Sequence, residues 1–327
     1  MSAHDQAIAT AQRAHGFATT NGDVLLQALS SHYLGVSYQA QGDYRRAIDC
    51  LGQTVAALDG SRLHERFGQV IPPSVLSRAW LAACHAELGR FAEGRALGES
   101  GLLMAEREDH AASLMIASWG IGLLTLRQGD LLRALPWLER AVDLCQDADL
   151  PAYFPWMAAA LGAAYTLGGR TVDAVPLLTR ALDQTMASDM MGHQVLCGLA
   201  LGEAQVLAGL LEQAQVLAKH TLALAWKHQE RGHQAYALRL LGDIAARREP
   251  PESDQGSEYY RQALSLADEL GMHPLAAHCH LGLGTLCAKI GHRAEARTKL
   301  SSAVECYQAM EMRLWLPQAE AALAQVG

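Results

Sequence analysis

Lysine is scarce in this chain of 327 residues, and its scarcity limits the partners that the chain can bind. Only Lys219, Lys227, Lys289 and Lys299 are present among 26 basic residues, and the formal net charge is -8. Binding to nucleic acid needs clustered Lys and Arg side chains that neutralise phosphates. Nucleic acid is therefore not expected as a partner.

Paired cysteines, a signal peptide and an uninterrupted membrane-length apolar run are also missing. Seven cysteines occur singly with no C-x-x-C pair, which is typical of reduced thiols in a cytoplasmic protein. Charged and polar residues interrupt residues 1–16, so no signal peptide is predicted. Residues 150–169 carry no charge, but Pro151, Pro155 and Gly162 interrupt them. We expect a buried helix there and no membrane span.

Catalytic, phosphate-binding and metal-binding motifs are absent too. The chain has no G-x-x-x-x-G-K-[ST], G-x-S-x-G or H-E-x-x-H. His278 and His280 lie two apart and would point to nearly opposite sides of a helix. His273, His280 and Cys287 could share one stripe, but their spacing also fits packing against a partner helix. We expect no enzyme activity, no cofactor and no metal.

What the chain does contain is a repeat. An aliphatic residue is followed at once by Gly or Ala, in most units by Gly eight positions later, and by Ala or Gly thirteen positions later, with two residues inserted in the sixth unit. Four successive intervals between these leading residues are forty residues each. The leading residues are Leu34, Leu81, Ile121, Leu161, Leu201, Leu241 and Leu283.

Each column of the repeat has a physical cause. The two small residues allow two helices to approach closely, and the glycine between them ends the first helix in a left-handed conformation. Stacked helix pairs bury the apolar face that one pair leaves exposed. The sequence therefore predicts a single all-α domain over 1–327, an α-solenoid of about seven helix pairs around an open hollow. An orphan helix at 4–16 would precede the pairs, as in a chain that starts mid-repeat, and a capping helix at 314–326 would close them.

The Leu-Gly, Tyr, Gly and Ala columns, with Gly42-Asp43-Tyr44, resemble tetratricopeptide repeats (TPR) over nearly the whole chain. The resemblance implies a right-handed superhelix with a concave groove. The family's tryptophan three before the lead is absent, and so is the proline that closes its second helix. Units of forty residues are more similar to the helical sensor arrays attached to bacterial signalling ATPases.

Four longer sequence segments carry a more specific resemblance, namely residues 73–81, 153–156, 270–280 and 310–318. They are similar to the C-terminal repeat region of bacterial proteins that join a class III adenylate or guanylate cyclase domain to an AAA-type ATPase. The resemblance implies a regulatory module with ATPase or cyclase domains in cis. Neither catalytic domain is in this chain.

The concave groove is the candidate binding site. In TPR superhelices its exposed slots lie about two and five before the lead and two after it. Arg239 with Glu203 and Asp243 would form a polar centre, and aromatic residues would supply apolar contact. A carboxylate clamp for chaperone tail peptides needs a lysine and asparagines on this face. The first unit has His32 and Val36 there, so such a partner is not expected. The predicted site residues are Trp119, Trp156, Glu203, Tyr236, Arg239, Asp243 and His278.

Two functions remain open at this point. One is a non-catalytic protein-interaction and regulatory module whose groove takes a protein or peptide partner. The other is a sensor domain that binds a small molecule or peptide by itself.

Overall fold

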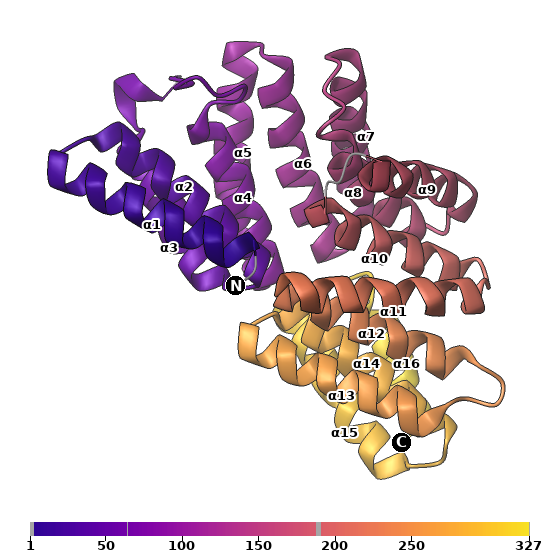
Figure 1. The fold of residues 1–327 in the computed structure, drawn as a ribbon. Helices are drawn as coiled ribbons and strands as arrows, with labels where there is room; N and C mark the ends of the chain where they lie inside the picture. Colours follow the sequence, from indigo (N-terminus) through magenta and orange to yellow (C-terminus); the bar gives the residue numbers. More distant parts are fainter. Residues whose placement is uncertain (1–2, 64, 188–190, 327) are drawn as a thin grey trace.

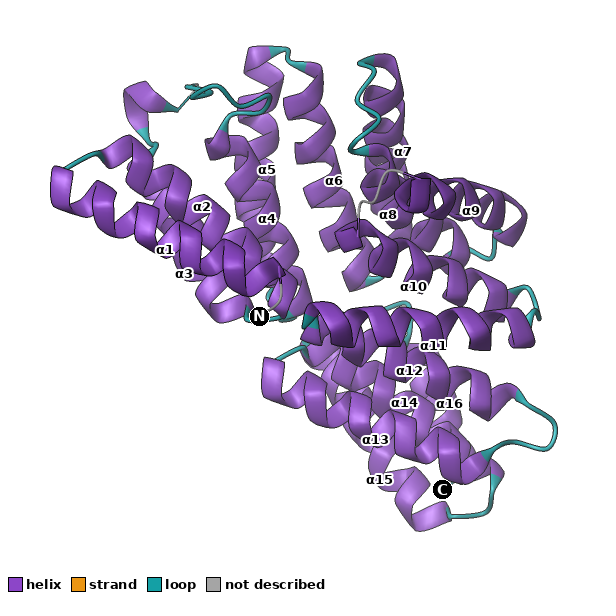
Figure 2. Ribbon diagram, viewed as in Figure 1, coloured by secondary structure: helices purple, strands orange, loops and turns teal. Residues whose placement is uncertain are grey.

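The computed structural model describes residues 3–63, 65–187 and 191–326, so residues 1–2, 64, 188–190 and 327 of the predicted domain lie outside it. In this part of the chain the fold consists of helices and loops, without strands (Figures 1 and 2). A short 3-10 helix, Gly60–Arg62, lies in the connector before α4. The α-helices are α1 (Ala3–Asn21), α2 (Val24–Gln41), α3 (Tyr44–Ala57), α4 (Pro73–Glu87), α5 (Phe91–Glu108), α6 (Ala111–Gln128), α7 (Leu131–Asp147), α8 (Phe154–Leu167), α9 (Thr171–Ala187), α10 (Met191–Leu207), α11 (Leu211–His228), α12 (Arg231–Arg247), α13 (Ser253–Leu270), α14 (His273–Lys289), α15 (Arg293–Ala309) and α16 (Leu316–Gln325).

The helices stack in pairs, from α2 with α3 to α14 with α15, and α1 and α16 flank the stack. The even-numbered helices are buried on most sides, whereas the odd-numbered ones bury a single face. Successive even-numbered helices also contact each other. They form the inner layer of the solenoid and the odd-numbered helices form the outer layer, which confirms the predicted all-α solenoid.

In four units the glycine after the lead packs against a leucine of the paired outer helix, and in the sixth unit Gly242 packs against Tyr260 instead. A Cβ added to Gly122 would lie 2.6 Å from Leu138, and one added to Gly284 would lie 2.8 Å from Leu300. Both leucines are fully buried. The predicted cause of this column is confirmed, because no larger side chain fits there without displacing the leucine.

In six of the seven units the glycine eight after the lead ends the inner helix, and Glu249 stands in its place in the other unit. Gly42 has φ 86° and its amide donates back into the last turn of α2, a conformation that a side chain would strain. Prolines stand at or near the first turn of α4, α8, α14 and α16, where a missing amide donor costs nothing. Within the described residues, no helix is both long enough and apolar enough to cross a bilayer.

The solenoid turns far enough for its two ends to meet, which the repeat pattern did not predict. Helix α2 contacts α12, and α4 contacts α14. Figure 1 shows the start of α1 beside the turn between α11 and α12, and the hydrogen-bonded pair His4–Glu230 joins them at 3.5 Å. Fully buried Cys84 and Leu275 belong to one core cluster across this junction.

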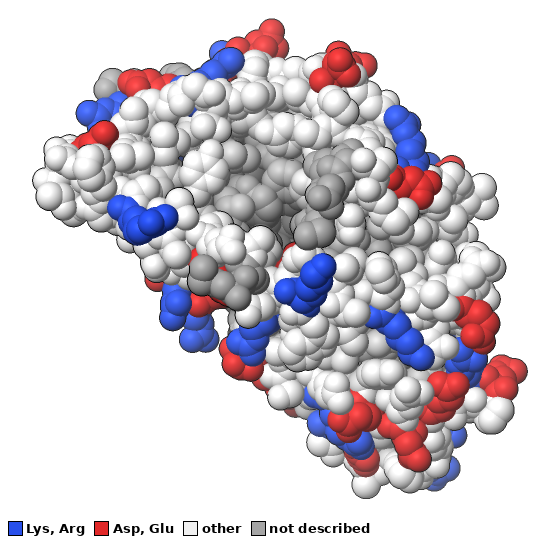
Figure 3. Space-filling model, in the orientation of Figure 1, with Lys and Arg blue, Asp and Glu red and all other residues white. Residues whose placement is uncertain are grey.

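We call this junction the seam. In it the turns after α2, α4 and α6 meet the beginnings of α12, α14 and α16. Figure 3 shows a hollow on the face turned to the viewer, with charged side chains mainly away from it. The predicted open hollow is visible in Figure 3, but the sequence did not predict that the two ends of the stack contact each other along the seam.

Candidate functional site

Four consecutive inner helices align their aromatic rings in one ladder. Trp80 of α4 stacks on Trp156 of α8 with ring centroids 4.7 Å apart, and Trp119 of α6 lies 4.4 Å from Trp156. His193 of α10 continues the stack at 6.2 Å, and Tyr153 flanks it at 6.4 Å. Such contacts orient the rings as well as bury them.

The ladder is more buried than the slot pattern predicts. Trp119 is 2% exposed and Trp156 is 8% exposed, because each ring covers the other and Trp80 covers both. Trp80 is the only ladder tryptophan that keeps intermediate exposure. The sequence missed it because it stands one before its lead; that slot shares a helix face with the slot five before the lead, where Trp156 stands.

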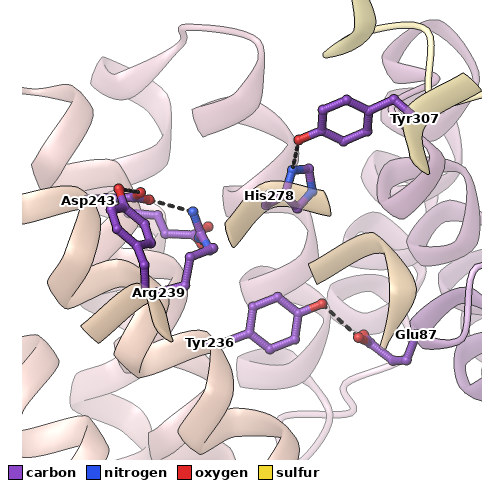
Figure 4. A network of polar contacts seen from close by, with 8 residues as sticks. Glu87, Tyr236, Arg239, Asp243, His278 and Tyr307 are labelled. Atoms are coloured by element: carbon purple, nitrogen blue, oxygen red, sulfur yellow. Dashed lines mark hydrogen bonds and ion pairs between the residues drawn. The ribbon is translucent and has the colours of Figure 1, made fainter. Parts of the chain in front are cut away.

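A charged triad joins the neighbouring inner helices α10 and α12. Arg239 of α12 donates to Asp243 at 2.5 Å and also to Glu203 of α10 (Figure 4). Tyr260 of α13 donates to the second oxygen of Asp243 at 2.5 Å. Burial would lower the pKa of Arg239, but the two carboxylates outweigh it and raise that pKa, so the guanidinium stays charged. The predicted polar centre is thus assembled as expected; its role in binding stays a prediction.

A second ion pair, Glu87–Arg127, joins α4 to α6 beside the seam, and Tyr236 contacts both residues from the other side. Tyr236 of α12 donates to Glu87 of α4 at 2.7 Å, and Arg127 of α6 donates to the other oxygen of Glu87 at 2.9 Å. The Arg127 guanidinium also lies 4.7 Å from the centre of the Tyr236 ring. Burial would lower the pKa of Arg127, and the neighbouring Glu87 and Tyr236 raise it instead.

His278 of α14 contacts two aromatic side chains. Its Nδ1 shares a 2.8 Å hydrogen bond with the Tyr307 hydroxyl, and its ring meets Trp315 edge-on at 4.6 Å. Burial, together with the positive charges of Arg239 and Arg127, lowers the pKa of His278 to about 3. It is therefore neutral at physiological pH. Across residues 3–63, 65–187 and 191–326, no three His, Cys, Asp or Glu side chains are arranged to hold a metal.

These polar groups border one cavity of about 480 Å³ on the inner face. Five of the seven predicted residues line it, namely Glu203, Tyr236, Arg239, Asp243 and His278. Trp119 and Trp156 do not; they belong to the ladder. The predicted residues thus form two groups on the same face.

The cavity has a sequence signal that the slot pattern overlooked. Residues six positions after the lead line its wall, and the same slot supplies Glu87 at the seam. The lining members of this column are Arg127, Leu167, Leu207, Arg247 and Lys289. This slot comes at the end of each inner helix, four residues beyond the slot that holds Glu203 and Asp243, so both lie on one helix face.

No protein-family model matches the chain, and no curated protein matches it in sequence. Solved structures do match in fold. A Rap protein complexed with competence and sporulation factor aligns with TM-score 0.70 at 11% identity, over 92% of this chain and 85% of that one. The fold is a TPR-like α-solenoid.

Two further TPR-like structures agree with this assignment. NprR in complex with its cognate peptide NprX aligns with TM-score 0.61 at 14% identity, over 93% of this chain and 84% of the other. The Rap conjugation gene regulator of plasmid pLS20, in complex with the Phr* peptide, gives TM-score 0.68 at 14% identity, over 91% and 78%. At these identities the likeness shows the TPR-like fold alone.

Proposed function

We propose that this chain is a non-catalytic binding module that holds an extended peptide on the inner face of its solenoid. One observation carries the proposal: a cavity of about 480 Å³ lies on that face, and Arg239 lies in its wall with its guanidinium paired to two carboxylates. Arg239 offers donors, and Glu203 and Asp243 offer acceptors beside it, which is what a peptide backbone with both N–H and C=O groups requires.

Two further features support a peptide ligand. The aromatic ladder on the same face presents Trp80, whose partly exposed ring can receive an apolar side chain. The Rap and NprR structures, which align over most of their length with this chain, were solved with peptides. The ligands of those structures support a peptide as the class of ligand for this chain, and they do not indicate its sequence.

A selection from a random peptide library tests the proposal. Peptides would be selected on the wild-type chain, and their affinities compared for Arg239→Met and for Arg170→Ala, in which an exposed outer arginine is removed. We expect selected peptides to lose at least about tenfold in affinity with Arg239→Met and none with Arg170→Ala. If no peptide is enriched, or if both variants bind equally, the proposal is wrong.

A small-molecule ligand is the second candidate, because the cavity volume also suits a compact metabolite. Thermal unfolding with a metabolite mixture separates the two. A metabolite that raises the melting temperature of the wild type but not of Arg239→Met would favour a sensor of small molecules.

We infer further that the module regulates signalling domains of ATPase or cyclase type. The support is the sequence resemblance of residues 73–81, 153–156, 270–280 and 310–318 to the C-terminal regions of such proteins. Ligand in the groove would alter the superhelix, and the attached or associated domain would respond. A pull-down with an ATPase domain encoded in the same polypeptide or operon tests this; a lack of retention would refute it.

A further inference from the structure

The turn glycines of the repeat fall into two classes that differ only in what faces them. All of them end an inner helix with positive φ, between 71° and 86°. A Cβ on Gly169, Gly209 or Gly291 would meet nothing within 4 Å. A Cβ on Gly42 or Gly129 would meet the opposite side of the seam.

These close approaches show how tightly the seam is built. A Cβ on Gly42 would lie 2.9 Å from the backbone nitrogen of Gly232, at the start of α12. A Cβ on Gly129 would lie 2.6 Å from the Trp315 ring and 2.9 Å from Leu314, just before α16. Neither neighbour can yield easily, because one is backbone and the other is a ring held by His278 and Tyr307.

The seam and the cavity share residues. Arg127 of α6 lines the cavity and also lies 4.7 Å from the ring centre of Tyr236 of α12, across the seam. Tyr236 lines it and donates to the carboxylate of Glu87 of α4. Trp315 lines it and packs on Gly129. If the seam opened, the wall formed by α6 would part from the wall formed by α12, α14 and α16, and the cavity would no longer be enclosed.

We propose that the seam is a latch with a closed and an open state, and that the cavity is a ligand site only in the closed state. A ligand that bridges Arg127 of the first half and Trp315 of the second binds the closed state alone, so it must shift the latch towards closure. Ligand and latch are then linked in both directions, and a change that opens the latch weakens binding in proportion to the loss of the closed fraction.

The buried seam residues indicate that the latch is closed in the free chain. Cys84, Met272 and Leu275 are fully buried there, and opening would return them to water. The contacts that would break lie at helix turns and helix beginnings, whereas the packing between neighbouring helices along the stack would remain. The chain can therefore open at the seam without unfolding its repeats.

Glycine-to-alanine substitutions at matched positions test the latch without any ligand. Gly42→Ala and Gly129→Ala place a methyl group in the seam, and Gly169→Ala and Gly209→Ala place the same group on an equally strained but open turn. We expect the seam variants to exchange amide hydrogens in α12 and α14 at least about tenfold faster than wild type and to show a larger radius of gyration by small-angle scattering.

The open-turn variants should match wild type in both measurements, apart from fraying of their own helix end. Circular dichroism verifies that each variant is folded, and Gly42→Ala decides the question should Gly129→Ala fail to fold. Equal exchange and equal size in the two classes would overturn the latch.

The coupling to a ligand rests on the proposed function and is tested separately. A peptide selected on the wild-type chain should bind Gly42→Ala at least about tenfold more weakly than Gly169→Ala. Equal binding by an opened chain would overturn the coupling and leave the peptide site intact. Failure to select any peptide would instead count against the proposed function, because the ligand-free measurements stand without it.

Discussion

Two glycines that lie within helices are expected to respond in opposite ways to substitution by alanine. Gly162 of α8 follows its lead and faces Leu178 of α9, whereas Gly52 of α3 has no atom within 4 Å of an added Cβ. Alanine in place of glycine favours the helix by about 1 kcal/mol at either position. Only the surroundings differ, so the pair isolates the cost of filling the small-residue column.

The magnitude follows from the contact at Gly162. A Cβ there would come within 2.5 Å of Leu178 Cδ2 and 2.8 Å of its Cδ1, so rotating the leucine exchanges one clash for another. Leu178 is itself fully buried. Overpacking of this kind costs about 1–3 kcal/mol, which offsets the helix gain and leaves a net loss of up to about 2 kcal/mol.

Urea unfolding followed by circular dichroism measures both variants. We expect the free energy of unfolding to rise by about 0.5–1 kcal/mol for Gly52→Ala and not to rise for Gly162→Ala, a difference of roughly 1–3 kcal/mol between them. If both alanines stabilise the chain equally, close helix approach is not the reason for the column, and the steric explanation of the repeat is wrong.

Three more predictions concern the inner face and the N-terminal contact. Replacing Glu203, Arg239 and Asp243 by Leu, Met and Leu, together with Tyr260→Phe to remove the hydroxyl that Asp243 accepts from, should leave the free energy of unfolding unchanged or higher while abolishing peptide binding, since buried ion pairs seldom stabilise more than apolar groups of similar size; a loss of several kcal/mol on urea unfolding would contradict this. Trp156→Ala should cost about 3–5 kcal/mol in the same assay, because it removes a buried ring from the centre of the ladder; a cost below about 1 kcal/mol would contradict the packing described. Burial would raise the pKa of Glu230, but hydrogen bonds from His233 and His4 lower it to about 2 from 4.5, so its stabilisation is present above about pH 4.5 and is lost as the pH falls towards 2. Glu230→Gln should therefore flatten the acid limb of the unfolding free energy, and an unchanged acid limb would refute the assignment.

The helices and their pairing could be predicted because their causes are local. A lead residue, its small neighbour and the glycine of the turn lie within a few positions of each other, and each column states one steric requirement. The charged triad was also predictable, because Arg239 and Asp243 are four apart on one helix and Glu203 is one repeat earlier. Because the pattern is periodic, positions that contact each other in one pair of units are expected to contact each other in the next pair.

The seam could not be predicted in this way. Tyr236 and Glu87 are 149 positions apart, and their contact depends on how far the whole stack turns. A small rotation at every pair accumulates along the chain, and the columns do not fix its size. The six-after-lead column indicates only the Glu87–Arg127 pair between neighbouring units, and not the Tyr236 contact across the seam.

The inner face keeps ionised groups where the repeat itself needs none. Packing along the stack is satisfied by small and apolar side chains, and an apolar inner face would serve stability as well. Arg127 and Arg239 are instead held charged beside a cavity, each with a carboxylate partner that fixes its direction. Because these charged side chains are already held in place, they lose little conformational entropy when a ligand binds. Ligands that cannot pair with them bind more weakly. Arg239 with Glu203 and Asp243 joins neighbouring helices α10 and α12 and takes no part in the seam contacts, and this is the strongest physical reason to propose the cavity as a binding site.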